Sequence, residues 1–279
     1  MTTKTLFCFG IGYTAQRLAA RLLPRRVRIA GTVRGEDKAA SLTDGGIDAQ
    51  VWGGAGGAAP DLPRDPNAVF LVSVPPDVDG CPAARTFARR VGARPVIYLS
   101  TTGVYGDRGG AWVDETSEPS PSGERGARRL AAEAGWQQGR EGATAVVRLP
   151  GIYGPGRSAI ERVRDGTARR IVKPGQVFSR IHVDDLAAGL EALIDRGVPD
   201  GVYHFADDEP APPEAPIAHA AALLGVEPPP VEDFETAQLS PMARSFYAEC
   251  KRVASARTRE GLDWTPRYPS YREGLAALL

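Results

Sequence analysis

The first 150 residues alternate between short apolar runs and segments with apolar residues at helical spacing. The apolar runs are typical of buried strands and lie at 5–9, 27–33, 48–52, 68–74, 95–100 and 144–149, the one at 48–52 being the weakest. Helical spacing predicts helices at 13–23, 38–46, 82–92 and from residue 122 into the 130s. Because this alternation is typical of βαβ units, we expect a mostly parallel sheet with helices on both faces.

The pattern changes after Pro150. A loop is expected at 151–157, followed by helix, short strand and helix, and then by one more strand at 201–206. A stretch rich in Pro and Ala follows, containing a helix at 215–225, and the remainder is expected to be helical with loops.

These observations predict an α/β protein with two parts. A Rossmann-type doubly wound parallel sheet is expected in residues 1–149, with a returning segment near 177–205. The smaller C-terminal substrate lobe is expected in residues 150–176 and 206–279, covering the ligand edge of the sheet.

A glycine motif follows the first expected strand. Gly10, Gly12 and Ala15 have the spacing G-x-G-x-x-A and open a helix, which is the context that dinucleotide binding requires. Gly10 permits the tight turn, Gly12 lets the backbone approach a pyrophosphate, and Ala15 lets the helix pack close to the strand. Tyr13 and Thr14, in the same turn, complete the candidate contacts, since an anion binds at a helix N-terminus. The alternative is an ordinary glycine turn between strand and helix.

The end of the second strand indicates which dinucleotide is preferred. An NAD site usually places Asp or Glu there, whereas the first charged residue here is Arg34. A guanidinium can bind a 2′-phosphate, and Thr32 can add a hydroxyl contact. We therefore expect NADP rather than NAD. The alternative is that Arg34 is solvated and that Glu36 or Asp37 binds the ribose.

Further candidate contacts lie where other strands end. Ser73 is a candidate cofactor contact at the end of the strand at 68–74. The segment STTGVYG, residues 100–106, leaves the strand at 95–100, and strand C-termini are where α/β proteins bind ligands. Thr101, Thr102 and Tyr105 can each present a hydroxyl there.

Composition excludes several classes of function. Lys plus Arg and Asp plus Glu are both 34, so the formal net charge is zero and gives no case for nucleic acid or an anionic membrane as partner. The three cysteines are far apart and, with the three histidines, show no metal-ligand spacing. No apolar stretch is long enough to span a bilayer, and the N-terminal apolar run is too short for a signal peptide. A reduced, cytoplasmic protein without a metal is the expectation.

The motifs in their order resemble the short-chain dehydrogenase/reductase superfamily, in the extended branch that includes NAD(P)-dependent nucleotide-sugar epimerases and dehydratases. The segments that carry the resemblance are the glycine turn, STTGVYG, RLPGIYGPG at 148–156, RIHVDDLAAGL at 180–190 and LDWTPRYPSYREGL at 262–275. The resemblance covers nearly the whole chain. It implies a Rossmann sheet of about seven strands and a C-terminal substrate lobe. It also implies that the backbone of Pro150 and Gly151 lies near the nicotinamide. Members of the family are often homodimers.

The resemblance also identifies catalytic positions whose residues are changed. The family's Ser/Thr falls on Thr101, while its Tyr and Lys, spaced Y-x-x-x-K, fall on Arg125 and Arg129 in RGARRLAAE. Arg129 can donate to ribose hydroxyls, but Arg125 cannot replace a phenol because guanidinium stays protonated. Alternatively these arginines form a solvated face, with Glu124–Arg128 and Arg129–Glu133 ion pairs. A stripe of Ala127, Leu130, Ala131 and Ala134 is expected to be buried against the sheet.

Another acid/base would then be needed. Tyr105 is the first candidate because it is near Thr101 in sequence, followed by Glu124, Lys173 and His182, although His182 is better explained as a packed polar residue. Asp184 and Asp185 are better explained as charges at a helix N-terminus. The literal Y-x-x-x-K at 247–251 lies in the C-terminal lobe and is a chance match.

Two functions remain open on the sequence. The first is an NADP-dependent oxidoreductase, epimerase or dehydratase on a small polar or sugar-like substrate. The second is a non-catalytic NADP(H)-sensing binding protein, which the missing Tyr and Lys favour. A nucleic-acid module has only the arginine cluster in its favour.

Overall fold

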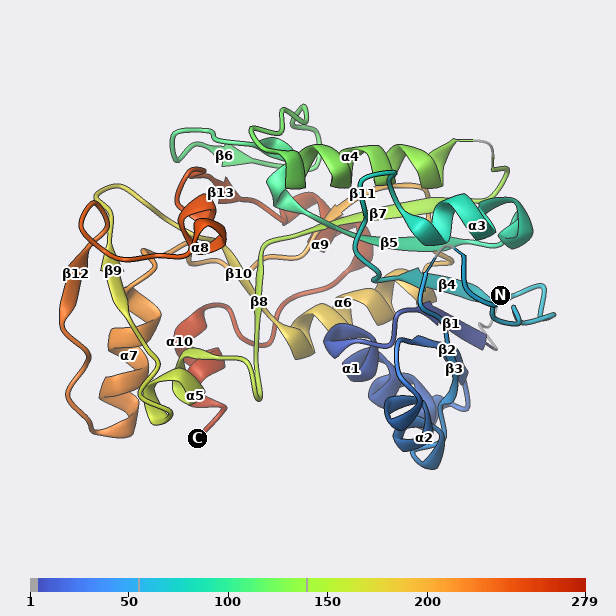
Figure 1. Ribbon diagram of the computed structural model, residues 1–279, viewed down its shortest axis with the longest axis horizontal. Coiled ribbons are helices and arrows are strands. Elements are labelled where there is room, and N and C mark those ends of the chain that lie inside the picture. The colour runs from blue at the N-terminus through green and yellow to red at the C-terminus, as the bar shows by residue number, and fades with distance from the viewer. Residues whose placement is uncertain (1–4, 55, 139) are drawn as a thin grey trace.

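The computed structural model describes residues 5–54, 56–138 and 140–279. Its centre is a parallel seven-stranded sheet in the order β11-β7-β5-β4-β1-β2-β3 (Figure 1). These strands are β1 (Thr5–Phe9), β2 (Arg28–Val33), β3 (Asp48–Val51), β4 (Val69–Val72), β5 (Val96–Thr101), β7 (Thr144–Leu149) and β11 (Gly201–His204). The predicted α/β class and doubly wound parallel sheet are confirmed.

Helices cover both faces of this sheet because each has one apolar stripe to bury. Apolar residues from one face of the sheet pack with α1 (Tyr13–Leu22), α2 (Glu36–Asp44) and α6 (Val183–Asp195). The other face packs with α3 (Pro82–Val91) and α4 (Glu124–Gln137). In Figure 1 the two groups of helices lie on opposite sides of the strands. The order β4-β1 marks the switch point, where open α/β sheets bind ligands at the carboxyl ends of the strands.

Besides α6, the chain after residue 150 forms α5 (Ala159–Arg164), α7 (Ala215–Leu224), α8 (Pro241–Phe246), α9 (Ala256–Leu262) and α10 (Tyr271–Ala276). In Figure 1 α5, α7, α8 and α10 lie to the left, and α9 lies nearer the middle. Helices α5, α7 and α10 share a small apolar core of their own, while β11 joins the central sheet beside β7. The short 3-10 helices are η1 (Leu23–Arg25) and η2 (Thr102–Tyr105).

Three pairs of short parallel strands lie outside the central sheet. They are β8 (Gly151–Tyr153) with β10 (Arg180–His182), β9 (Arg170–Val172) with β12 (Val231–Asp233), and β6 (Trp112–Val113) with β13 (Arg252–Val253). The expectation of a loop throughout 151–157 was wrong for its first three residues, because β8 pairs with β10 in register. Each pair joins segments far apart in sequence, and the pair β6–β13 ties the C-terminal part of the chain to a segment that precedes α4.

No helix within the described residues is both long enough and apolar enough to cross a lipid bilayer.

Candidate functional site

The glycine turn after β1 is held from two sides. Gly10 has φ +91°, in the region that favours glycine, and its N–H donates to Thr32 Oγ1 at 3.0 Å. The Ser73 hydroxyl donates to the Gly10 carbonyl at 2.5 Å. Thr32 and Ser73 were expected to contact the cofactor, but both hydroxyls bind the turn itself. They set the path of the backbone at the switch point.

The turn leads directly into the N-terminus of α1. A Cβ built on Gly12 meets nothing within 4 Å, so the space outside this turn is open. No side chain caps the helix and no acidic residue lies in its first turn, so the site suits an anion. Thr14 and Ala15 are buried in the packing of α1, and the Tyr13 phenol donates to the Pro155 carbonyl at 3.1 Å. The backbone of these residues, rather than their side chains, is therefore what remains for a pyrophosphate.

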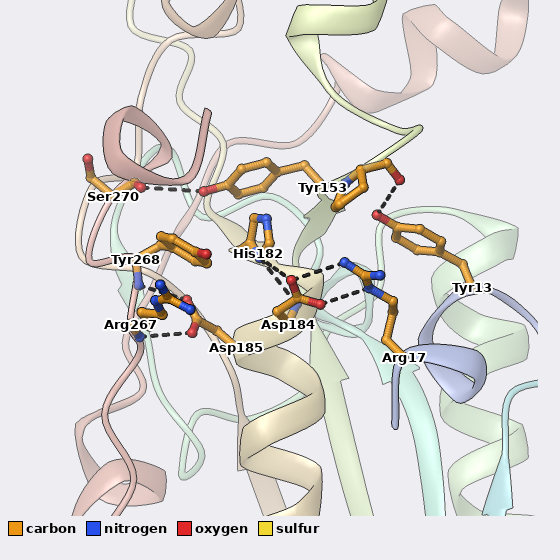
Figure 2. Close-up of polar contacts among 10 residues, drawn as sticks. Tyr13, Arg17, Tyr153, His182, Asp184, Asp185, Arg267, Tyr268 and Ser270 are labelled. Carbon is orange, nitrogen blue, oxygen red and sulfur yellow. Dashed lines mark hydrogen bonds and ion pairs between the residues drawn. The ribbon is translucent and has the colours of Figure 1, made fainter. Parts of the chain in front are cut away.

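Polar contacts join this turn to the start of α6 (Figure 2). Arg17 of α1 makes a two-bond ion pair with Asp184, at 2.7 and 3.0 Å. His182 caps α6 through its Nδ1, which accepts from the Asp184 N–H at 3.2 Å, and burial lowers the pKa of the imidazole. Asp185 accepts from the backbone N–H groups of residues 267 and 268. These contacts fix α6 and the C-terminal segment beside the glycine turn, while the buried Nε2 of His182 has no hydrogen-bond partner within the described residues.

The end of β2 is where adenosine specificity is decided in this fold. Arg34 follows the last residue of β2 and is exposed, whereas Glu36 and Asp37 lie in the first turn of α2. Together with the open space at Gly12, this arrangement fits a dinucleotide at this end of the sheet.

The ends of β5 and β7 lie side by side, with Thr101 opposite Leu149. The Thr101 hydroxyl accepts from the Gly103 N–H at 3.2 Å and keeps its own proton to donate, while the Thr102 hydroxyl donates to the Leu149 carbonyl. Gly151 starts β8 and its N–H donates to the Ser179 carbonyl. Thr101, Pro150 and Gly151 are thus brought to the same edge of the sheet.

A buried charged network lies beneath this edge. Glu133 of α4 pairs with Arg148 of β7 at 2.8 Å, and their side chains are only 4% and 7% exposed. Ser100 donates to Glu133, while Arg148 donates to the Tyr105 phenol at 2.9 Å. Although burial opposes the charge on Arg148, its bonds to Glu133 and Tyr105 raise its pKa overall.

The location of Tyr105 in this network is incompatible with the predicted acid/base role. Its side chain is fully buried, and its phenol lies 2.7 Å from His204 Nε2 and donates to the Asp114 carbonyl at 3.1 Å. Burial raises the pKa of Tyr105. A phenol enclosed in this way does not reach a ligand at the edge of the sheet, so Tyr105 is not a proton donor for such a ligand.

The arginines of α4 lie on the face turned toward the strand ends. Arg129 donates to the Leu99 carbonyl at 2.8 Å and to the Tyr98 phenol at 3.4 Å. Arg125 is exposed, with its guanidinium 5.1 Å from the centre of the Phe246 ring. The Glu124–Arg128 ion pair is present as expected. The alternative Arg129–Glu133 pair was wrong, because Glu133 is committed to Arg148.

The expected buried stripe of α4 was also wrong. Ala127 and Ala131 are exposed, and Leu130 and Ala134 are only partly buried. The buried positions are Gly126, Ala132, Glu133 and Trp136. A Cβ on Gly126 would lie 2.5 Å from the Gly103 carbonyl oxygen, so the helix approaches η2 closely here. The helix is therefore rotated about its axis relative to the expected orientation, and this rotation turns Arg125 and Arg129 toward the strand ends.

The remaining acid/base candidates are committed elsewhere. Lys173 donates to the Tyr247 carbonyl, and its ammonium lies 5.2 Å from the centre of the Phe234 ring. The Tyr247–Lys251 segment is not helical, since α8 ends at Phe246, and Lys251 pairs with Glu249. Within the described residues no group of three or more His, Cys, Asp or Glu side chains can hold a metal ion.

Asp207 is a buried carboxyl that the sequence did not single out. It is 3% exposed, and within the described residues neither oxygen has a hydrogen-bond partner. Burial raises its pKa to about 8, with Arg180 acting in the opposite direction. It lies just beyond β11, where its N–H donates to the Arg180 carbonyl.

This carboxyl predicts a pH effect on stability. Between about pH 4, the ordinary Asp pKa, and pH 8, folded Asp207 holds a proton that the unfolded chain releases, so the free energy of unfolding falls as pH rises. Asp207→Asn, which mimics the protonated form, should be more stable than wild type at pH 8. Its free energy of unfolding should also lack the pH dependence that Asp207 causes. Urea denaturation of both proteins from pH 5 to 8 measures it. Parallel stability curves for the two proteins would contradict the prediction.

The comparisons with known proteins agree with this architecture. No family model matches the chain. A functionally unknown conserved protein from Silicibacter pomeroyi is 46% identical, with a TM-score of 0.91, and the match covers 99% of this chain and 98% of that chain. A 3-diazoavenalumate denitrifying reductase from a Streptomyces species is 28% identical over 233 residues, 77% of this chain and 74% of the relative.

A more distant structure shares the fold. It is a human epimerase family protein with NADPH, which is 16% identical with a TM-score of 0.75, over 98% of each chain. The chain thus has the fold of NAD(P)-dependent epimerase/dehydratase-like proteins, and the curated relative with which it aligns over 77% of its length is a reductase.

Proposed function

We propose that the chain is an NADP-dependent oxidoreductase that reduces a small polar substrate without a Tyr-x-x-x-Lys pair. The observation that carries this proposal is the glycine turn. Gly10 is held between Thr32 and Ser73, the N-terminus of α1 is open, and Arg34 follows β2, the strand next to β1. The curated relative named above is itself a reductase, and the human structure named above contains NADPH, which supports the same choice.

Different residues of the chain would bind different parts of the dinucleotide. The N–H groups at the start of α1 would bind the pyrophosphate, Arg34 the 2′-phosphate, and the Pro150–Gly151 backbone would lie near the nicotinamide. NADPH supplies a hydride when bound. Thr101 retains a proton that can be donated to a polar atom of the substrate.

Reduction fits the changed residues better than epimerisation or dehydration. The family's Tyr exchanges a proton with the substrate, and guanidinium groups at Arg125 and Arg129 stay protonated at any physiological pH. A reduction needs one proton in addition to the hydride, and water at the open edge can supply it. Epimerisation and dehydration need a group that both takes and returns protons.

Arg34 provides the first test. Arg34→Ala should weaken NADPH binding by about tenfold or more and leave NADH binding unchanged, because only NADPH has the 2′-phosphate. Titration of the protein with NADPH, NADP+, NADH and NAD+ at equal ionic strength measures this. Arg196→Ala, an exposed arginine beyond the far end of α6, is the matched control and should bind all four like wild type. Failure of all four dinucleotides to bind wild type at millimolar concentration would reject the proposal.

A non-catalytic NADP(H) sensor is the second candidate function. The arginines at the Tyr and Lys positions favour it, because a sensor needs no proton exchange. A sensor should discriminate strongly between NADPH and NADP+ in the titration above, and bound NADPH should not be oxidised by any acceptor. Turnover with any carbonyl or similar acceptor would reject the sensor.

We further propose that the protein acts in the cytoplasm, on a small molecule, as a monomer or homodimer, with neither nucleic acid nor membrane as partner. The three cysteines are free thiols, which suits a reducing compartment. Sedimentation of the purified protein distinguishes the two oligomeric states.

A further inference from the structure

A small cavity lies where the family's catalytic Tyr and Lys would project. Its volume is about 230 Å³. It is lined by Pro75 and Pro76 of the loop after β4, and by Glu124, Arg125, Arg128 and Arg129 of α4. Because β4 is next to β1 in the sheet, this cavity opens at the same edge as the glycine turn.

The charge inside this cavity is unbalanced. Arg128 and Glu124 form an ion pair and offset each other. The contacts of Arg125 and Arg129 are with an aromatic ring, a carbonyl and a phenol, all uncharged. Across residues 5–54, 56–138 and 140–279, neither makes an ion pair. Two positive charges one helical turn apart thus face a cavity with no carboxylate of their own.

The helix that contacts Arg125 carries exposed apolar side chains. Phe246 of α8 lies over Arg125 and remains 48% exposed, and Met242 one turn earlier is 71% exposed. The segment after α8 is held alongside α4, because Ser122 donates to Glu249 at 2.8 Å. Glu249 is itself offset by Lys251 at 2.6 Å. Large exposed apolar side chains beside a charged cavity are typical of a ligand site.

We propose that this cavity binds the carboxylate of a small substrate whose polar group is this carboxylate and whose remaining part is apolar. Arg125 and Arg129 hold the carboxylate through hydrogen bonds, and the apolar part packs on Phe246 and Met242. Guanidinium suits this role because its planar donors match a carboxylate, and Arg129 has donors left after its bond to Leu99. The inference rests on the proposed function, since it makes the bound acid the substrate of the reduction. It assigns to the two arginines recognition of an anion in place of proton transfer.

Binding of benzoate tests the assignment without turnover. The probes are benzoate, its uncharged counterpart benzamide, acetate, and inorganic phosphate, each titrated by NMR or calorimetry with and without NADPH. Wild type should bind benzoate at least tenfold better than benzamide or acetate, and better than phosphate. Arg125→Gln and Arg129→Gln should each weaken benzoate binding about tenfold or more. Arg89→Gln, an exposed arginine on α3, is the matched control and should leave it unchanged.

The outcomes separate this inference from the proposed function. Equal binding of benzoate and benzamide, or no saturable benzoate binding by wild type, overturns the carboxylate site. If phosphate binds as tightly as benzoate, the claim that the ligand has an apolar part is wrong. Weaker NADPH binding by Arg125→Gln with benzoate binding unchanged assigns the arginine to the cofactor and overturns the inference. Benzoate binding by a wild type that binds no dinucleotide supports the site and rejects the proposed function. Thermal melts show whether each variant is folded. If Arg129→Gln does not fold, the benzoate affinity of Arg125→Gln alone decides, because residue 125 is exposed and its substitution should not affect folding.

Discussion

Gly12→Val is expected to fold like wild type and to lose about a hundredfold or more in affinity for NADPH. A Cβ at this position meets no protein atom within 4 Å, and Gly12 has φ −92°, which valine tolerates. The added side chain would instead occupy the space through which a pyrophosphate approaches the N-terminus of α1. Fluorescence titration with NADPH and a thermal melt on the same preparation measure the two effects separately.

The control for this variant is Gly261→Val. A Cβ on Gly261 also meets nothing within 4 Å, and this residue lies in α9 on the exposed surface. Its NADPH affinity should equal that of wild type. If Gly12→Val binds NADPH like the control, the open space at the turn is not the dinucleotide site, and the proposed function fails with it.

The sequence predicted the central sheet well because its inner strands are continuous buried runs, whereas β3 and β11, at the two edges, are only partly buried. β4 and β7 are buried at every position, and such runs need no information from elsewhere in the chain. The two- and three-residue strands were not predictable in this way. β8 contains a glycine and an exposed start, and it is a strand only because β10 pairs with it from residue 180. Pairing of that kind is a tertiary contact with no periodicity in the local sequence.

In the candidate site, too, some features were predictable from the sequence and others were not. The glycine spacing correctly located the turn, since that motif encodes backbone geometry. The roles of side chains were less predictable. Tyr105 is four residues from Thr101, but the intervening 3-10 helix turns its ring inward, where it meets Arg148 and His204 from positions 43 and 99 residues away. A polar residue that binds another buried polar residue cannot be told from a catalytic one by spacing.

Glu133→Ala should give the largest loss of stability, about 3–5 kcal/mol in the free energy of unfolding. The substitution leaves the Arg148 guanidinium, whose side chain is 7% exposed, without its counter-ion and also removes the partner of Ser100. An unpaired buried charge costs far more than the net contribution of the pair. Urea denaturation measures the change.

The matched control lies on the same helix. Glu124→Ala removes the carboxylate of an exposed ion pair with Arg128 and should cost only about 0.5 kcal/mol, since water replaces the lost partner. The double variant Glu133→Gln/Arg148→Met removes both charges and should be more stable than Glu133→Ala, because no unpaired charge remains buried. If Glu133→Ala costs no more than Glu124→Ala, then Arg148 is not confined and the network does not fix β5, β7 and α4 together. If the cost is large, the same network holds Thr101 and the α4 arginines in place, and NADPH affinity of the surviving folded variant should fall along with stability.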